Sequence, residues 1–215
     1  MGVGVKQDYE KSAQWYQKAA VQGLALAQSN LGAMYENGLG VKRDYVKAVE
    51  WYEKAAAQDY TLAQANLAYM YSEGLGVKQD YEKALEWYQK VAVKGDAEAQ
   101  YNIGYIYETV KQDYVKAMEW YQKSAAQGFA AAQYNIGYLY YRGLGAKQDY
   151  AKTFEWFKKA ADQGDADAQF GIGLLYHKGL GMPQDNETAL EWFKKAAQQG
   201  HIHARKQIKE LSADN

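Results

Sequence analysis

Cysteine is absent from the 215 residues. The chain therefore cannot form a disulfide, a thiolate metal site or a cysteine nucleophile. The chain has a single proline, so its helices are almost uninterrupted. It contains no run of about 18 apolar residues, the length that a membrane-spanning helix needs. The first residues, MGVGVKQDYE, lack the apolar core of a signal peptide. The sequence is compatible with a soluble cytoplasmic, periplasmic or secreted protein, because a lack of cysteine does not distinguish these compartments.

The chain also has little net charge and few histidines. The formal net charge is −1, with acids and bases interspersed, so the chain lacks the basic face of a nucleic-acid-binding protein. The histidines are His177, His201 and His203, and the last two do not share a helix face. No serine lies in a G-x-S-x-G motif. We therefore predict no catalytic residues, no metal site and no other cofactor, in a protein that is not an enzyme.

Tyrosine and tryptophan are abundant, and they mark a repeat. The tryptophans recur every 36 residues, with one interval of 33: Trp15, Trp51, Trp87, Trp120, Trp156 and Trp192. A second column follows each of the first five by 20 residues: Tyr35, Tyr71, Tyr107, Tyr140 and Tyr176. A fixed period of this size indicates stacked helical units. The short interval falls where YETVKQDY replaces YSEGLGVKQDY.

Each unit has the pattern of two helices joined by a turn. The first helix, in LAQANLAYMYSEG (62–74), spaces its apolar residues helically and stops at a glycine. After the GLGV turn, Asp80 is placed to cap the second helix, YEKALEWYQKVA. That helix has an apolar stripe: Ala84, Trp87, Tyr88, Val91 and Ala92. Recurring i,i+4 pairs predict a solvated opposite face: Glu50/Lys54, Glu86/Lys90, Glu119/Lys123, Glu155/Lys159 and Glu191/Lys195.

The repeated pattern A-x-x-x-L-G-x-x-Y-x-x-G-x-G-V-x-x-D-x-x-K-A-x-x-W-Y-x-K-A-A-x-x-G begins at Ala27 and resembles the Sel-one-type repeat, a relative of the tetratricopeptide repeat. The chain departs from it in the missing Gly-x-Gly turn after Tyr107 and in Met182-Pro183. The resemblance implies an all-α fold, a right-handed α/α superhelical solenoid of helix-turn-helix repeats that binds protein partners. It supplies no catalytic residue to carry over.

We predict one repeat domain. Its units are a half repeat with only a second helix (1–24), repeats at 25–60, 61–95, 96–128, 129–164 and 165–200, and a capping helix (201–215). Residues 2–8 align with 74–80, so we expect a truncated N-terminus from which earlier repeats and any signal peptide are missing. The opening helix would then expose part of its apolar stripe (Tyr9, Trp15, Tyr16 and Ala19), which predicts end-to-end self-association.

The variable positions of the first helices predict a binding groove, because in related solenoids these helices line the concave face. Tyrosines gather at i, i+4 and i+7 in repeats three and four, and asparagines run beside them. The candidate residues are Tyr69, Tyr101, Tyr105, Tyr134, Tyr138, Tyr141, Asn66, Asn102 and Asn135. Tyrosine is favoured both in packing and at interfaces, so packing between neighbouring first helices is the alternative role for these tyrosines.

The leading functional hypothesis is a bacterial-style scaffold or adaptor that binds a protein or peptide in this groove. We expect no nucleic-acid partner and no insertion into membranes. One alternative is an inhibitor or immunity-type protein that wraps and blocks a cognate enzyme. A second alternative is a cell-wall-ligand-binding or weakly hydrolytic protein, although the chain lacks cysteine and a nucleophile–base set.

Overall fold

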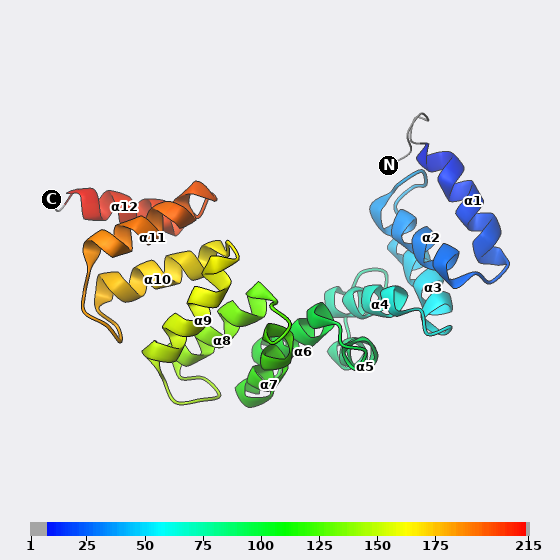
Figure 1. The fold of residues 1–215 in the computed structure, drawn as a ribbon. Coiled ribbons are helices and arrows are strands. Elements are labelled where there is room, and N and C mark those ends of the chain that lie inside the picture. Colours follow the sequence, from blue (N-terminus) through cyan, green and yellow to red (C-terminus); the bar gives the residue numbers. More distant parts are fainter. Residues whose placement is uncertain (1–7, 214–215) are drawn as a thin grey trace. The chain divides into compact units, whose positions relative to one another are not determined.

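A computed structural model describes residues 8–213, and over this range the chain is all-helical (Figure 1). The helices are α1 (Tyr9–Val21), α2 (Ala25–Asn37), α3 (Tyr45–Ala56), α4 (Thr61–Glu73), α5 (Tyr81–Ala92), α6 (Ala97–Thr109), α7 (Tyr114–Ala125), α8 (Ala130–Arg142), α9 (Tyr150–Asp162), α10 (Ala166–Lys178), α11 (Asn186–Gln198) and α12 (Ile202–Ala213). The expected all-α fold of tandem helix-turn-helix repeats is confirmed. The predicted opening turn at residues 2–7 lies outside the described residues.

The chain forms two compact units, residues 1–99 and 100–215, and each is described by itself. The first contains α1 to α5, the second contains α7 to α12, and the boundary falls within α6. Among the described residues, no helix is long and apolar enough to cross a membrane. The division into a half repeat, five repeats and a capping helix stays a prediction.

The helix ends follow the turn chemistry of the repeat. Gly74 ends α4 in the left-handed region at φ 69°, where glycine carries no steric penalty. Asp80 then caps α5, since its Oδ1 accepts the backbone N–H of Lys83 at 3.1 Å. The Asp80 N–H also donates to the Tyr71 carbonyl at 2.9 Å, which closes the connection between the helices.

The short connection, residues 110–113, keeps the same closure with three fewer residues. Helix α6 has 13 residues, the same length as α4, so the deletion does not extend it. Gln112 supplies the left-handed residue at φ 54°, and the Asp113 N–H donates to the Tyr107 carbonyl at 2.9 Å. The second helix keeps its register, and Tyr121 remains fully buried.

The core of each helix pair is an aromatic ring of the second helix against a small residue of the first. A Cβ added to Gly137 would lie 2.6 Å from Phe157 Cδ1, and one added to Gly104 would lie 2.7 Å from Tyr121 Cδ1. Such distances exclude a side chain without rearrangement. The glycines inside the first helices therefore accept a cost in helix propensity because an aromatic ring occupies the space.

A buried glutamine joins consecutive helices in a recurring bridge. Gln133 Nε2 donates to the Ala125 carbonyl of the preceding helix at 3.4 Å, and its Oε1 accepts from Gln163 Nε2 at 2.8 Å. Gln28 with Gln58 and Gln169 with Gln199 repeat the arrangement. Because the bridge satisfies both ends of a buried amide, it fixes the spacing of the helices that it joins.

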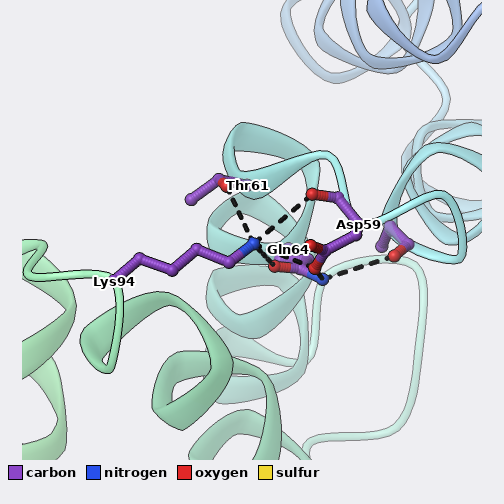
Figure 2. A network of polar contacts seen from close by, with 5 residues as sticks. Asp59, Thr61, Gln64 and Lys94 are labelled. Carbon is purple, nitrogen blue, oxygen red and sulfur yellow. Dashed lines mark hydrogen bonds and ion pairs between the residues drawn. The ribbon is translucent and has the colours of Figure 1, made fainter.

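Lys94 takes the place of the second glutamine in one of these bridges (Figure 2). Its Nζ lies 2.9 Å from Asp59 Oδ1, 3.1 Å from Thr61 Oγ1 and 3.4 Å from Gln64 Oε1. Asp59 has φ 61°, at a turn where the matching residues are glycines, among them Gly23 and Gly95. An aspartate in the left-handed region therefore accompanies the lysine and supplies its counter-charge.

The lysines of the predicted i,i+4 pairs contact tryptophan. The ammonium groups of Lys54 and Lys90 each lie 4.0 Å from the ring centroid of the tryptophan three residues earlier. The later repeats have the same contact. A cation over an indole face is attracted by the ring quadrupole. These lysines thus cover the half-buried tryptophans.

Candidate protein-binding surface

Five of the candidate tyrosines lie on α6 and α8 of the second unit, and we call this set the tyrosine face (Tyr101, Tyr105, Tyr134, Tyr138 and Tyr141). Each helix presents a ladder of two rings. Tyr101 and Tyr105 stack with their centroids 6.3 Å apart, and Tyr134 and Tyr138 stack at 6.4 Å. The i,i+4 spacing places both rings of a ladder on one side of the helix.

The lower ring of each ladder packs into the protein. Tyr101 lies 5.6 Å from Tyr121 and 5.3 Å from Phe129, and Tyr134 stacks on Phe157 at 5.3 Å. Burial raises the pKa of both Tyr101 and Tyr134. At these two positions the side chains are half-buried and pack against neighbouring aromatic rings, which is the alternative role for the candidate tyrosines.

The upper ring of each ladder is more available to a partner. Tyr105 is 50% exposed, and its hydroxyl has no protein partner in the described part of the chain. Tyr138 is half-buried, and its hydroxyl accepts a hydrogen bond from Arg142 Nη1 at 2.9 Å. The Arg142 guanidinium carbon also lies 5.8 Å from the Tyr138 ring centroid.

Tyr141 is the member of the tyrosine face nearest the end of α8. It is half-buried, and its ring lies 5.8 Å from Tyr150 at the start of α9. Its carbonyl accepts a hydrogen bond from Gln148 Nε2 at 2.8 Å, so the residue also anchors the following connection. Tyr141 is therefore held in place from two sides, with only part of its ring at the surface.

Two candidate residues, Tyr69 and Asn66, belong to the first unit. Tyr69 is 46% exposed on α4. Asn66 is half-buried on the same helix. Tyr69 matches Tyr105 in the repeat, so it offers a second exposed ring of the same kind in its own unit.

The asparagines lie beside buried tyrosine hydroxyls. Tyr121 donates its hydroxyl hydrogen to Glu108 Oε2 at 2.6 Å, and the Asn135 side chain interacts with the same hydroxyl. Burial, and then the Glu108 carboxylate, raise the pKa of Tyr121. In the first unit, Tyr52 donates to Glu36 Oε2 at 2.5 Å beside Asn66, with the same effects on its pKa.

This tyrosine–glutamate–asparagine cluster was missed from the sequence, although the sequence contains its signal. Repeat four has Phe157 in place of the buried tyrosine, and Gly171 then stands where the other repeats have asparagine. A Cβ at Gly171 would lie 2.6 Å from Phe157 Cε2, so the ring fills that space. Asn66 and Asn135 thus occur where a tyrosine hydroxyl is present to interact with their side chains. Asn102, which is half-buried, forms no side-chain hydrogen bond within residues 8–213.

The side chains of His177 and His201 form structural hydrogen bonds. His201 Nδ1 accepts the Ala204 N–H at 3.1 Å and so caps α12, while its Nε2 lies 3.1 Å from Asp167 Oδ1. Over the described chain, no three histidine, aspartate or glutamate side chains are grouped as metal ligands. Among the described residues, the tyrosine face is therefore the candidate site with the most structural support.

Comparison with known families agrees with this architecture. The Sel1 repeat model matches residues 1–24, 25–60, 61–96, 97–129, 130–165 and 166–201. The chain belongs to the Sel1 repeat family. Sel1 repeat proteins are in general non-catalytic scaffolds for protein interaction. No curated protein matches the chain.

Solved structures show the same fold. A protective antigen of uropathogenic Escherichia coli is 38% identical, with a TM-score of 0.86 over 97% of this chain and 45% of its own. The Sel1 repeat chain thus spans less than half of that relative. A Sel1 repeat protein from Oxalobacter formigenes is 36% identical, with a TM-score of 0.83 over 94% of this chain and 84% of its own. An immunity protein from Pseudomonas aeruginosa is 21% identical, with a TM-score of 0.52 over 98% of this chain and 77% of its own, and it shares the fold alone.

Proposed function

We propose that this Sel1 repeat chain is an interaction scaffold that binds a protein or peptide partner on its tyrosine face and catalyses no reaction. The observation that carries the proposal is Tyr105, a large ring that is 50% exposed on a helix whose other aromatic residues are packed. Tyrosine is enriched at binding hot spots, because it buries a large apolar area and still offers a hydroxyl.

The packed lower rings supply the rigidity that such a surface needs. Tyr101 and Tyr134 are fixed by contacts with Tyr121 and Phe157, and they support Tyr105 and Tyr138 from below. A side chain that is ordered before binding loses little conformational entropy when the partner arrives. The surface is therefore prepared for binding by the same contacts that stabilise the helix pairs.

The two asparagines of this unit have different roles: Asn135 interacts with a buried hydroxyl, and Asn102 is available to a partner. Asn135 lies beside the Tyr121 hydroxyl, so its amide is partly committed to the interior. Asn102 lies next to the Tyr101–Tyr105 ladder in sequence, and its side chain forms no hydrogen bond within the described chain. In this account Asn102 is the amide that bonds the backbone of a bound segment, while Asn135 chiefly positions its own repeat.

The test is a double substitution, Tyr105→Ala with Tyr138→Ala. A partner is first isolated by retention on the immobilised chain, and its affinity is then measured beside helix content and thermal melting. We expect a loss of about 2 kcal/mol or more in binding free energy, as truncation of aromatic anchors commonly produces. If the partner is an enzyme that stops working when bound, the chain is a blocking protein and not an adaptor.

The matched control is Tyr9→Ala, which removes an exposed tyrosine of α1 outside the tyrosine face. We expect unchanged affinity for this variant. Normal binding by the double variant would refute the assignment of the tyrosine face. Unfolding of the double variant would show that these tyrosines are core residues, and packing would then be their role.

A further inference from the structure

The tyrosine face continues along a row of matching positions in the second unit. Tyr105, Tyr138 and Leu174 occupy the same position in α6, α8 and α10. Tyr138 packs against the apolar cluster formed by α9 and α10, and Leu174 packs against the next cluster, formed by α11 and α12. The row therefore presents partly exposed apolar side chains across consecutive first helices.

One edge of this row is basic. Four residues after Tyr138 and Leu174, at the ends of α8 and α10, stand Arg142 and Lys178, and both are exposed. Neither forms an ion pair with a carboxylate of the described chain. The aspartates of the two following connections are used as caps, since Asp149 accepts the Lys152 N–H and Asp185 accepts the Thr188 N–H.

The helix dipole does not by itself account for these cations. A positive charge is favoured at the C-terminus of any helix. The same position carries Asn37 in α2 and Glu73 in α4, so the first unit does not follow this preference. The basic edge occurs in the unit that holds the tyrosine ladders.

Arg142 is held against the tyrosine face and keeps most of its donors. Its Nη1 donates to the Tyr138 hydroxyl at 2.9 Å, which uses one of the N–H groups of the guanidinium. The remaining donors are arranged to meet a carboxylate in a two-point contact. At the start of α10 the charge has the other sign, because exposed Asp167 stands there, 3.1 Å from His201 Nε2.

From this charge arrangement, and resting on the proposed function, we infer that the partner is an acidic protein segment. It places an apolar or aromatic side chain on Tyr105, Tyr138 and Leu174, and its carboxylates meet Arg142 and Lys178. Charges at the rim of an interface chiefly govern orientation, association rate and salt dependence. The tyrosines accordingly supply most of the affinity, and the basic edge selects the sign of the partner's charge.

The experiment is selection of a displayed random peptide library on the immobilised full chain. We expect the enriched peptides to be acidic and to contain an aromatic or large aliphatic residue. A synthetic copy of an enriched peptide should bind about 10-fold more tightly than its amide version, with aspartate and glutamate changed to asparagine and glutamine. Added salt should remove most of this difference, because it screens exposed charges.

Three variants separate the two claims. Arg142→Glu with Lys178→Glu should reverse the selected charge, whereas Lys194→Glu with Lys209→Glu, an equal change in net charge elsewhere on the unit, should leave it acidic. Tyr105→Ala with Tyr138→Ala should remove the enrichment. Neutral or basic peptides whose selection depends on the tyrosines would overturn this inference and leave the proposed function standing. Selection that ignores the tyrosines, or no selection at all, would overturn both.

Discussion

The buried tyrosines that follow Trp51 and Trp120 show how a single residue determines its neighbours. Tyr52 and Tyr121 have no exposed surface, and each hydroxyl donates to a glutamate of the preceding first helix. Phe157 needs no acceptor, and Tyr141 and Gly171 occupy the corresponding positions there. In these repeats the choice between tyrosine and phenylalanine thus agrees with the residues found at two other positions.

Tyr121→Phe tests this dependence. Burial raises the pKa of Glu108, and the Tyr121 hydroxyl opposes that rise by donating a hydrogen bond. Removing the hydroxyl leaves a partly buried carboxylate without its donor, so the free energy of unfolding should fall by about 1–2 kcal/mol. Urea unfolding measures the change. Tyr121→Phe combined with Glu108→Tyr copies the pair of repeat four and should recover part of the loss; equal losses would contradict the account.

Alkaline pH should destabilise the fold through the same residues. Burial raises the pKa of Tyr52 and Tyr121 above the ordinary tyrosine value of 10.0. Above that pH the unfolded chain releases protons that the folded chain retains, so the free energy of unfolding falls as the pH rises; below it the contribution is complete. Urea unfolding at about pH 8 and about pH 11 measures the fall. Tyr121→Phe should make it shallower, and an equal slope in both proteins would count against the explanation.

Residue-scale prediction from the sequence was strongest where periodicity fixed the side chain and weakest where an interaction crossed between helices. The cap at Asp80 followed from its place before an apolar stripe. The asparagine column was interpreted as ligands for a partner because its relation to the buried hydroxyls spans 14 residues, as between Asn135 and Tyr121. Whether the tyrosines bind a partner depends on that partner, which a single chain does not specify.

The turn between α3 and α4 shows how an element departs from the repeat. Asp59 adopts φ 61°, and Lys94 interacts with it and with Gln64 (Figure 2). Lys94 lowers the pKa of Asp59 through a hydrogen bond, which agrees with an ion pair. The pair is exposed to solvent, so it adds little to the stability of the fold.

Asp59→Gly with Lys94→Gln restores the glycine and glutamine of the other repeats. We expect the melting temperature to rise by about 2 °C or more, because glycine adopts a left-handed conformation without strain. Differential scanning calorimetry gives the comparison. Asp59→Ala with Lys94→Gln keeps a side chain in the left-handed region and should not show the rise. A lower melting temperature for the glycine variant would mean that the lysine network outweighs the strain.

At the scale of the element, helix positions were predictable and loop geometry was not. The period of the apolar residues placed every second helix, and the glycines placed the ends of the first helices. The short connection could be recognised from its length. Nothing in the sequence identified Gln112 as the residue that adopts the left-handed conformation. The bridge through Gln28, Gln133 and Gln169 was also overlooked, because glutamine at a helix start resembles an ordinary surface residue.

At the scale of the whole molecule, the exposed Trp15 of α1 is the residue most relevant to self-association. Trp51 packs against Ala20, Ala27 and Leu31 of the neighbouring helix pair, whereas Trp15 is 68% exposed in the described chain. We expect concentration-dependent self-association through this face, because exposed apolar patches mark contact sites. Sedimentation velocity over a concentration series tests it, with Trp15→Lys expected to weaken association. A monomer at every concentration would rule out self-association through this face.

The central claim is that a partner covers the tyrosine face, and nitration of tyrosine measures this directly. The complex and the free chain are treated with tetranitromethane, and the modified residues are identified by peptide mass spectrometry. Tyr105 and Tyr9 are both exposed in the free chain and serve as probe and internal control. We expect Tyr105 to lose its reactivity in the complex while Tyr9 keeps it. Equal nitration of Tyr105 in the free and bound states would contradict the account.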